Sequence, residues 1–549
     1  MTSTQATPNP TPHDLHKLRY LVVDDFENFR LSMRQMLRSF GVESVELVSN
    51  GAAAIQRCTY EHFDVVLCDY NLGEGKNGQH ILEELRHKKL LKRTSLFLMV
   101  TAETSKEMVM GAREYQPDAY LIKPINRAML EKRLSTLVDQ RNALLPINRE
   151  IDRENLPEAA SLCLQAIPKQ PRYKTWLMKT LADLYFQMGD FGHARKIYDD
   201  VLAQRDLSWA RLGKARVLLA EQHLDQSVSE LQSLIDNHPD FIEAYDTLAD
   251  ALSRQGKPGQ AQRILEKAAE LSPNALLRQR QLAKLATANQ DIDRATDAWR
   301  RTVQLGTHSI HDNADHHLAL SSALADISEA ETGSDARQQA AEAMQVLSRM
   351  EKRFADTPGA QTRSLLVKAR VHAGQGQQDS ATACLQQAQA DIDPAAVSAE
   401  VGMELGRTLF RMGRHKEAES LLGQLAQRFE SQPEVIQEIE ALLDEPVGFK
   451  QKLQARALNR DAIKAFESGQ LETAAVAFRQ ALEIVPGHAA LNLNLVQVHM
   501  KQMAEGNRDP ELLAESRRCL AALNNLPEQH RQYRRLVTLR KKLDSLSHD

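Results

Sequence analysis

The chain has 549 residues, a length that allows about three or four domains of average size. Its 69 Lys and Arg residues nearly balance its 73 Asp and Glu residues, and the net charge of −4 argues against a protein that coats nucleic acid or an anionic membrane. Aromatic residues make up only 5% of the sequence, which favours helices packed through Ala and Leu over an aromatic-rich β-sandwich.

Neither a membrane span nor a secretion signal is expected from the sequence. No apolar run approaches the roughly 18 residues that a spanning helix needs, and residues 1–16 are polar and rich in Thr and Pro. We expect residues 1–16 to form a disordered tail. The five cysteines form no CxxC or Cys/His cluster, so we expect no disulfide framework or zinc site and place the protein in the reducing cytoplasm.

Short apolar runs alternate with helical patterns over about the first 140 residues. The runs are YLVV at 20–23, SVELV at 44–48, DVVLCD at 64–69, LFLMVT at 96–101 and AYLI at 119–122. Helical patterns separate them, the first ending at Gly41 and the others lying near 51–60, 78–90, 105–114 and from 126 onward. Buried strands separated by helices predict an α/β doubly wound, five-stranded parallel sheet with its site at the carboxyl ends of the strands.

Polar residues fall at those predicted strand ends. Asp24 and Asp25 follow the first strand, Asp69 ends the third, Thr101 ends the fourth and Lys123 follows the fifth. Three converging carboxylates repel one another unless they share a cation, and oxygen ligands select a hard ion such as Mg²⁺. A lysine and a hydroxyl can offset the charge of a phosphoryl group, and an Asp carboxylate can be its acceptor. One such residue alone is typical of a turn or cap, but their joint order favours phosphoryl chemistry.

Residues 17–138 resemble the receiver domain of two-component response regulators, especially the chemotaxis regulators. The resemblance is carried by VDDFENFR at 23–30, VTAE at 100–103 and YLIKP at 120–124. It implies that a histidine kinase or a phosphotransfer protein phosphorylates Asp69, with Mg²⁺ as the cofactor.

The same resemblance implies roles for the residues at the strand ends. Asp25, Asp69 and the backbone carbonyl of Asn71 would bind Mg²⁺ directly. Asp24 would bind the ion through water or orient it. Lys123 would pair with the phosphoryl group, and Asp69 would carry that group.

Further positions concern switching and signal lifetime. The resemblance implies that Thr101 turns toward the phosphoryl group and that Tyr120 moves inward behind it. Asn71 and Glu103 resemble the chemotaxis regulators at positions where polar groups help to place the hydrolytic water. This resemblance implies a short-lived phosphoryl group. The loop DYNLGEGKNG at 69–78 departs from the family, because it is one residue longer and has Gly where many receivers have Pro.

After residue 146 the strand-like runs end and Ala-rich helical patterns take over. Ala182, Ala215, Ala249 and Ala283 lie 33, 34 and 34 residues apart in one recurring frame. Small residues let two helices approach closely, Gly permits the turn between them, and Pro marks the passage to the next unit. About seven copies resemble tetratricopeptide repeats, which predicts an all-α superhelical solenoid rather than a generic helical bundle.

These patterns predict the domain boundaries and the residues of a groove that could bind a partner protein. We predict a tail at 1–16, a receiver domain at 17–138, a helical linker or first repeat at 139–170, tetratricopeptide repeats at 171–305, a divergent helical segment at 306–360, and repeats with a helical cap at 361–549. By repeat position, the candidate groove residues are Trp176, Lys179, Asp183, Phe186, Glu243, Asp246, Asp250, Arg407 and Phe410. His316 and His317 are expected at the surface rather than as ligands.

The sequence therefore favours a phosphorylation-switched response regulator whose repeats bind an unknown protein or peptide. We expect no direct nucleic-acid contact, no membrane insertion and no enzymatic activity beyond self-catalysed phosphotransfer and dephosphorylation. A constitutive scaffold that uses the receiver for docking is one alternative. A DNA-linked transcription regulator is less favoured, because the charge is near neutral and no helix-turn-helix sequence is present.

Overall fold

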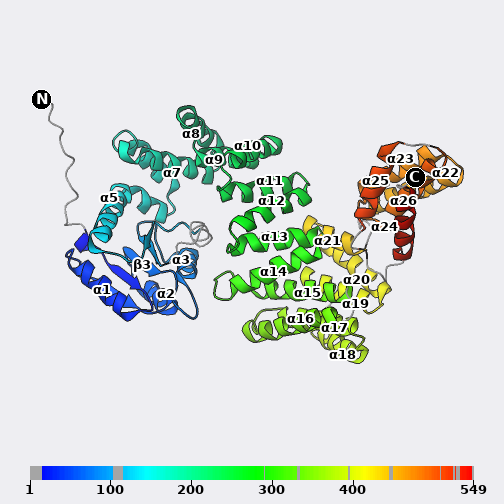
Figure 1. Ribbon diagram of the computed structural model, residues 1–549, viewed down its shortest axis with the longest axis horizontal. Helices are drawn as coiled ribbons and strands as arrows, with labels where there is room; N and C mark the ends of the chain where they lie inside the picture. Colours follow the sequence, from blue (N-terminus) through cyan, green and yellow to red (C-terminus); the bar gives the residue numbers. More distant parts are fainter. Residues whose placement is uncertain are drawn as a thin grey trace. The chain divides into compact units, whose positions relative to one another are not determined.

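The chain divides into two compact units, residues 1–285 with 298–312, and residues 286–297 with 313–549. The computed structural model describes residues 15–102, 115–289, 291–330, 334–393, 396–443, 449–506, 509–523, 526 and 532–546 (Figure 1). The first unit begins with an α/β domain, and helices make up the rest of the described chain.

A five-stranded parallel sheet forms the centre of the α/β domain. Its strands are β1 (Tyr20–Val23), β2 (Val45–Val48), β3 (Val65–Asp69), β4 (Leu96–Thr101) and β5 (Ala119–Ile122). Their order in the sheet is β2-β1-β3-β4-β5, so the direction of winding reverses between β1 and β3. The doubly wound prediction is confirmed, and this reversal is where such sheets form a crevice at their carboxyl ends.

Helices cover both faces of the sheet. They are α1 (Glu27–Arg38), α2 (Gly51–Tyr60), α3 (Gly78–His87) and α5 (Arg127–Asp152). One apolar core joins Tyr20 and Leu67 to α1 and α5, and a second joins Leu21 and Phe97 to α2 and α3. Both cores form because every β1 and β3 side chain is buried, alternating between the two faces. The predicted helix at 105–114 lies outside the described residues.

One predicted boundary is wrong. The tail does not extend through residue 16, because a short 3₁₀ helix begins at Leu15 and that side chain is buried. Helix α5 runs without a break from the predicted receiver into the predicted helical linker, because it continues to Asp152 with Pro146 inside the helix. Leu144 and Ile147 extend its apolar stripe into a core that it shares with the next helices. One helix thus belongs to both the α/β domain and the first helix pair.

The helices after α5 and up to residue 306 are α6 (Leu156–Ala166), α7 (Lys174–Gln187), α8 (Phe191–Gln204), α9 (Ser208–Ala220), α10 (Leu224–Asn237), α11 (Ile242–Arg254), α12 (Pro258–Leu271), α13 (Leu276–Ala288) and α14 (Ile292–Gly306). From α5 to α12, each helix packs against the next one in the chain, as the repeat prediction requires. The four alanines of the repeat frame are all fully buried. A side chain at Gly213 would overlap the Tyr198 ring of the neighbouring helix, and Gly256 turns the chain with a φ of +71°. Small residues therefore set the close helix spacing.

The second unit continues the same paired arrangement. Its helices are α15 (Ala314–Ala330), α16 (Ser334–Arg353), α17 (Ala360–Gly374), α18 (Gln378–Ala390), α19 (Ala399–Arg411), α20 (His415–Arg428), α21 (Pro433–Leu443), α22 (Phe449–Glu467), α23 (Leu471–Ile484), α24 (Ala489–Ala504), α25 (Pro510–Ala521) and α26 (Tyr533–Leu546). The segment predicted as divergent contains the longer pair α15 and α16, of 17 and 20 residues. Helices α22 to α26 share one apolar cluster.

His316 and His317 were expected at the surface, and this prediction is wrong. They lie on α15 with exposed fractions of 2% and 7%. Helix α15 packs against both α16 and α17, so its side chains are covered from two sides. The His317 ring lies 5.5 Å from the Phe354 ring.

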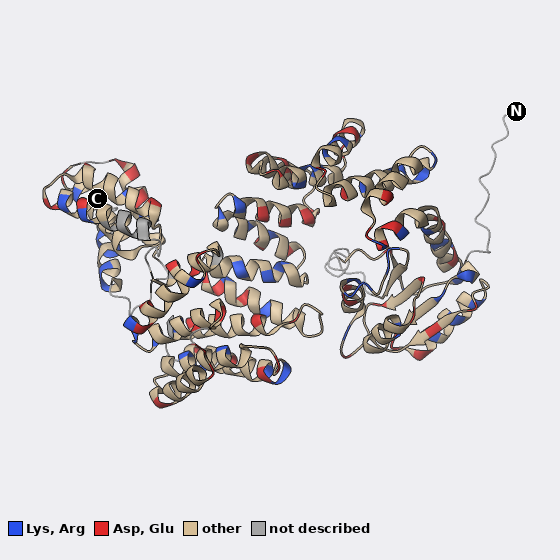
Figure 2. Cartoon of the chain, turned by 180° about the vertical axis from the view of Figure 1, so that it is seen from behind, with Lys and Arg blue, Asp and Glu red and all other residues tan. Residues whose placement is uncertain are grey.

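Acidic and basic residues are mixed along the helices rather than gathered by sign (Figure 2). Among the described residues, no helix combines the length and the apolar character needed to cross a bilayer.

Candidate functional site

Three carboxylates gather where the sheet reverses its winding. Asp24 and Asp25 directly follow β1, and Asp69 is the last residue of β3. Because β1 and β3 are parallel neighbours, their carboxyl ends meet, and one ligand oxygen from each residue lies within 4.8 Å of the others. Asp24 and Asp69 are buried, whereas Asp25 is exposed. The predicted convergence of these carboxylates is what the structure shows.

Lys123 bridges the two buried carboxylates. Its ammonium lies 2.8 Å from Oδ2 of Asp24 and 2.8 Å from Oδ2 of Asp69. Burial raises the pKa of Asp69, and the hydrogen bond from Lys123 opposes that shift. Burial also acts to lower the pKa of Lys123, but the bonds to both carboxylates outweigh it and raise that pKa. The Lys123 ammonium thus lies among the three carboxylates of the site.

Other groups fix the position of this cluster. The Lys123 ammonium lies 4.2 Å from the centre of the Phe29 ring, an attractive cation–π distance. The backbone N–H of Phe26 donates to Oδ1 of Asp24 at 2.8 Å, and Arg30 donates to the Asp24 carbonyl at 2.6 Å. Both contacts come from α1 and its preceding turn, so this helix holds Asp24 and Lys123 in place.

The loop between β3 and α3 carries Asn71. This residue is exposed, and its side-chain oxygen accepts a hydrogen bond from the Gly73 N–H at 3.3 Å. Gly73 has a φ of +73°, which Pro cannot adopt, so the departure from the family has a conformational reason. At the end of the loop, a side chain at Gly78 would overlap the Asp69 carbonyl. The end of the loop is therefore packed directly against the Asp69 backbone.

Thr101 and Tyr120 lie on the next two strands. Thr101 ends β4, beside the β3 strand that carries Asp69, and it is half-buried. Tyr120 lies in β5 opposite Met99 and packs against the core that α2 and α3 cover. Their predicted switch roles stay predictions. Glu103 lies outside the described residues.

The residues of this cluster fit Mg²⁺. The donor set consists of oxygen atoms, which hard divalent cations prefer, and the exposed Asp25 leaves a ligand that faces solvent. A bound divalent ion would also offset the mutual repulsion of the three carboxylates.

Several predicted groove residues have partners inside the helical region. Asp246 on α11 forms two 2.8 Å hydrogen bonds with the buried Arg278 on α13. Phe186 on α7 packs against Phe191, with ring centres 5.4 Å apart. Asp250 pairs with Arg254 at 2.9 Å on the same helix. The contacts of Asp246 and Phe186 thus link neighbouring helices, whereas the pair of Asp250 lies within α11.

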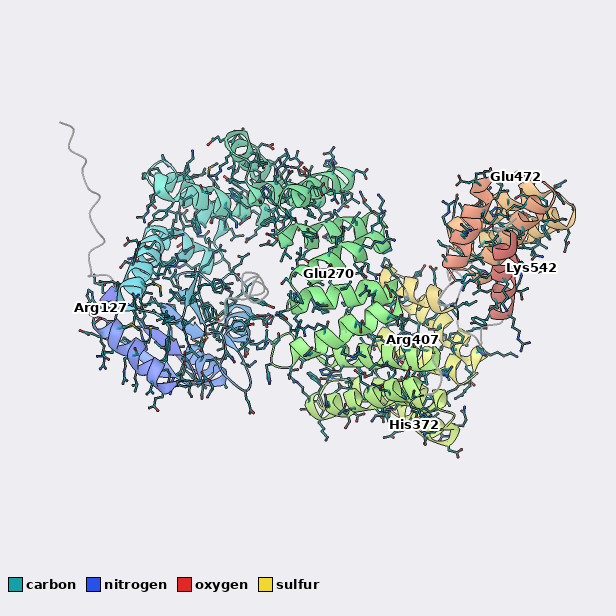
Figure 3. The ribbon with its side chains drawn as sticks, viewed as in Figure 1. Arg127, Glu270, His372, Arg407, Glu472 and Lys542 are labelled. Carbon is teal, nitrogen blue, oxygen red and sulfur yellow. The ribbon has the colours of Figure 1, made fainter. Side chains whose placement is uncertain are left out.

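The remaining groove residues also lie on first helices of their pairs. Arg407 (Figure 3) lies on α19 and approaches Glu404 at 3.4 Å and Glu438 at 3.8 Å. The other five predicted groove residues are exposed or half-buried; they are Trp176, Lys179, Asp183, Glu243 and Phe410. The structure places these residues on first helices as predicted, and their binding role stays a prediction.

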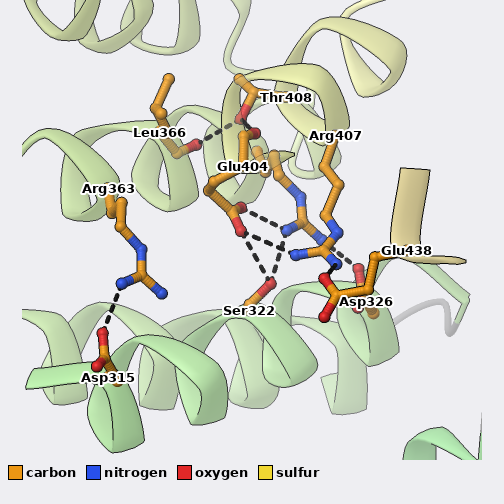
Figure 4. Close-up of polar contacts among 10 residues, drawn as sticks. Asp315, Ser322, Asp326, Arg363, Leu366, Glu404, Arg407, Thr408 and Glu438 are labelled. Carbon is orange, nitrogen blue, oxygen red and sulfur yellow. Dashed lines mark hydrogen bonds and ion pairs between the residues drawn. The ribbon is translucent and has the colours of Figure 1, made fainter. Parts of the chain in front are cut away.

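A buried charge network that the sequence does not reveal lies in the second unit (Figure 4). Arg370 on α17 donates to Glu404 on α19 at 2.7 Å and to Ser322 on α15 at 2.9 Å, and it also pairs with Asp326. Arg370 and Glu404 are only 2% and 5% exposed. The pairing of each charge marks this network as a link between three successive first helices.

Comparisons with known proteins agree with this geometry. Residues 20–135 match the response regulator receiver domain family, and residues 242–275 match a tetratricopeptide repeat family. The chemotaxis protein CheY-3 of Vibrio cholerae is 28% identical over 123 residues, which cover 22% of this chain and 93% of that protein. The chemotaxis protein CheY of Pseudomonas aeruginosa is 26% identical over 125 residues, which cover 23% and 99%.

Among solved structures, the Vibrio cholerae chemotaxis protein CheY4 is 28% identical, with coverage of 22% of this chain and 98% of that chain and a TM-score of 0.21. The family matches show that residues 20–135 are a response regulator receiver domain and that the helical region contains a tetratricopeptide repeat at residues 242–275.

Proposed function

We propose that this protein is a phosphorylation-switched response regulator of two-component signal transduction. A histidine kinase or phosphotransfer protein would supply the phosphoryl group to Asp69, and the repeats would pass on the signal by binding a protein or peptide. The observation that supports this proposal is the cluster in which Lys123 bridges Asp24 and Asp69 at 2.8 Å, inside a receiver domain.

In the proposed reaction, an Asp69 carboxylate oxygen attacks the phosphorus of a phosphohistidine. The new O–P bond forms as the N–P bond to the histidine breaks, and the imidazole leaves with the electron pair. Lys123, which donates to Asp69 in the structure, would move its hydrogen bond to a phosphoryl oxygen. Thr101 would then turn toward the same group, and Tyr120 would follow it inward.

Magnesium would supply positive charge to the phosphoryl oxygens in this reaction. Asp25, Asp69 and the Asn71 carbonyl would hold the ion, and Asp24 would orient it. Asn71 is exposed beside the acceptor, which supports a role in placing the water that hydrolyses the acyl phosphate.

Removal of Mg²⁺ tests the proposed chemistry. When the full chain is incubated with a small phosphodonor such as acetyl phosphate, chelation of Mg²⁺ should slow phosphoprotein formation by about 10- to 100-fold. Intact-mass spectrometry measures the phosphorylated fraction over time, and restored Mg²⁺ should restore the rate. Equal rates with and without the ion would contradict the assigned role of the acidic cluster.

Phe29 should contribute a smaller effect by positioning Lys123. Phe29→Leu removes the aromatic face beneath the ammonium, and we expect phosphorylation to slow by roughly threefold to tenfold, because cation–π contacts of this kind are worth about 0.5–2 kcal/mol. Phe26→Leu is the matched control, because Phe26 is 69% exposed. The prediction fails if both variants react at the wild-type rate.

A further inference from the structure

One face of the receiver helix α3 contacts a segment of the helical region. We call residues 306–312 the 306–312 segment; it starts at the last residue of α14 and belongs to the same compact unit as the receiver. Ser309 donates from its hydroxyl to Oε2 of Glu83 at 2.6 Å. Lys76, just before α3, donates to the His308 carbonyl at 2.8 Å. Residues more than 200 positions apart in the sequence thus meet.

The contacts follow one face of α3. His80, Glu83 and His87 are spaced by three and four residues, so their side chains lie above one another on the helix. The His80 ring lies 6.3 Å from the His308 ring. Glu83 lies 3.5 Å from His311, and the His87 ring lies 5.4 Å from the His311 ring. Each residue of this face therefore meets a residue of the 306–312 segment.

Burial shows that this face is covered. Glu83 is 7% exposed and its partner Ser309 is 8% exposed, although a Glu on an outer helix normally faces water. A buried carboxylate is costly unless hydrogen bonds compensate it, and the Ser309 hydroxyl supplies one.

The contact is polar and incompletely packed. A cavity of about 280 Å³ remains beside it, lined on the receiver side by Tyr70, Gln79 and His80 and on the α14 side by Arg301 and Gln304. Small, polar contacts between parts of one chain are typical of contacts that open and close. The contact between α3 and the 306–312 segment can therefore form and dissociate.

The β3–α3 loop connects the contact to the phosphoacceptor. The loop begins after Asp69, carries Asn71, and reaches Lys76 before α3 starts at Gly78. Lys76 also pairs with Glu84 at 2.8 Å, so its ammonium ties the loop to both α3 and the 306–312 segment. The loop is anchored at one end by the acidic cluster and at the other by the helical region.

We propose that the face of α3 formed by His80, Glu83 and His87 is an intramolecular docking surface for the 306–312 segment, and that this docking holds the β3–α3 loop in position for phosphoryl transfer. The docking is independent of the proposed function, whereas its effect on phosphoryl transfer rests on it. Such a route would connect the phosphoacceptor to the repeats through α3.

The test uses the full-length chain and hydrogen exchange measured by mass spectrometry. Ser309→Glu places a second carboxylate against buried Glu83, and we expect amide exchange in residues 78–87 and 306–312 to accelerate roughly tenfold or more, because hydrogen bonds to charged groups and like-charge contacts have this magnitude. Ser229→Glu is the matched control, since Ser229 is exposed on α10. The double variant Glu83→Gln/Ser309→Glu removes the repulsion and should restore slow exchange.

The outcomes separate the docking from the proposed function. Wild-type exchange in Ser309→Glu, or no recovery in the double variant, would overturn the docking. If docking holds, Ser309→Glu should also slow phosphorylation of Asp69 by acetyl phosphate severalfold, because loss of a preorganised loop misplaces the Mg²⁺ ligand. Faster exchange with an unchanged phosphorylation rate would overturn the effect on phosphoryl transfer. Absence of phosphorylation in the wild type would instead contradict the proposed function and leave the exchange result standing.

Discussion

Asp69→Asn should abolish phosphorylation of the full-length chain. The amide lacks the nucleophilic carboxylate that forms the acyl phosphate, yet it has the same shape and can still accept a hydrogen bond from Lys123. Asp24 and Asp25 do not replace it, because Asp24 is held by the Phe26 N–H and Lys123, and Asp25 lies exposed at the rim. Intact-mass spectrometry after incubation with acetyl phosphate and Mg²⁺ measures the effect.

The matched control for this substitution is Glu74→Gln. Glu74 lies exposed in the same β3–α3 loop and contributes no oxygen to the cluster. The Glu74→Gln variant should be phosphorylated at the wild-type rate. This result would show that removal of one negative charge from the loop does not explain the loss of phosphorylation in Asp69→Asn. A wild-type level of phosphoprotein in Asp69→Asn would assign the phosphoryl group to another residue and contradict the site.

Arg370→Met should destabilise the second unit by about 3–5 kcal/mol, the usual range for removal of one partner from a buried ion pair. Arg370 donates to Glu404 at 2.7 Å, and both residues are almost fully buried between α15, α17 and α19 (Figure 4). The methionine fills much of the space but leaves the Glu404 carboxylate without this partner. Amide exchange in residues 360–374 and 399–411 of the full chain should report the loss locally.

Two variants distinguish a buried pair from a general effect of charge. Arg414→Met removes an Arg that pairs with Glu417 at the surface, and it should change stability little. Arg370→Met/Glu404→Leu removes both buried charges and should recover most of the lost stability, because well-packed apolar residues can replace a buried ion pair. If Arg370→Met is as mild as Arg414→Met, the network does not link the repeats as described.

The receiver could be predicted in detail because its signals are local. The buried strands β1, β3 and β4 are short and mostly apolar runs, and the acidic residues after β1 and at the end of β3 are those that converge at the site. Parallel pairing brings strand ends together without any further information. The repeat frame was visible for a similar reason, since Ala215 and Ala249 recur at a fixed spacing and both are fully buried.

Features that depend on long-range packing could not be predicted. Helix α5 continues through Pro146 to Asp152 because Leu144 and Ile147 pack into a core shared with the next helices, and the sequence pattern alone does not show this packing. Glu83 is buried by a segment that lies far from it in the sequence, and the Arg370–Glu404 pair likewise joins two separate helices. The identity of a charged residue does not show which distant helix will cover its side chain.

In the proposed switch, phosphorylation of Asp69 changes the helical region, which a constitutive scaffold would not require. Hydrogen exchange of the full-length chain in Mg²⁺, with and without the phosphoryl analogue beryllium fluoride, tests it most directly. A ligand shifts such an equilibrium only if the two states differ in affinity for it, so a switch must show exchange changes outside residues 20–135. We expect such changes in the wild type and none in Asp69→Asn. Changes confined to residues 20–135 would contradict the switch and favour the scaffold.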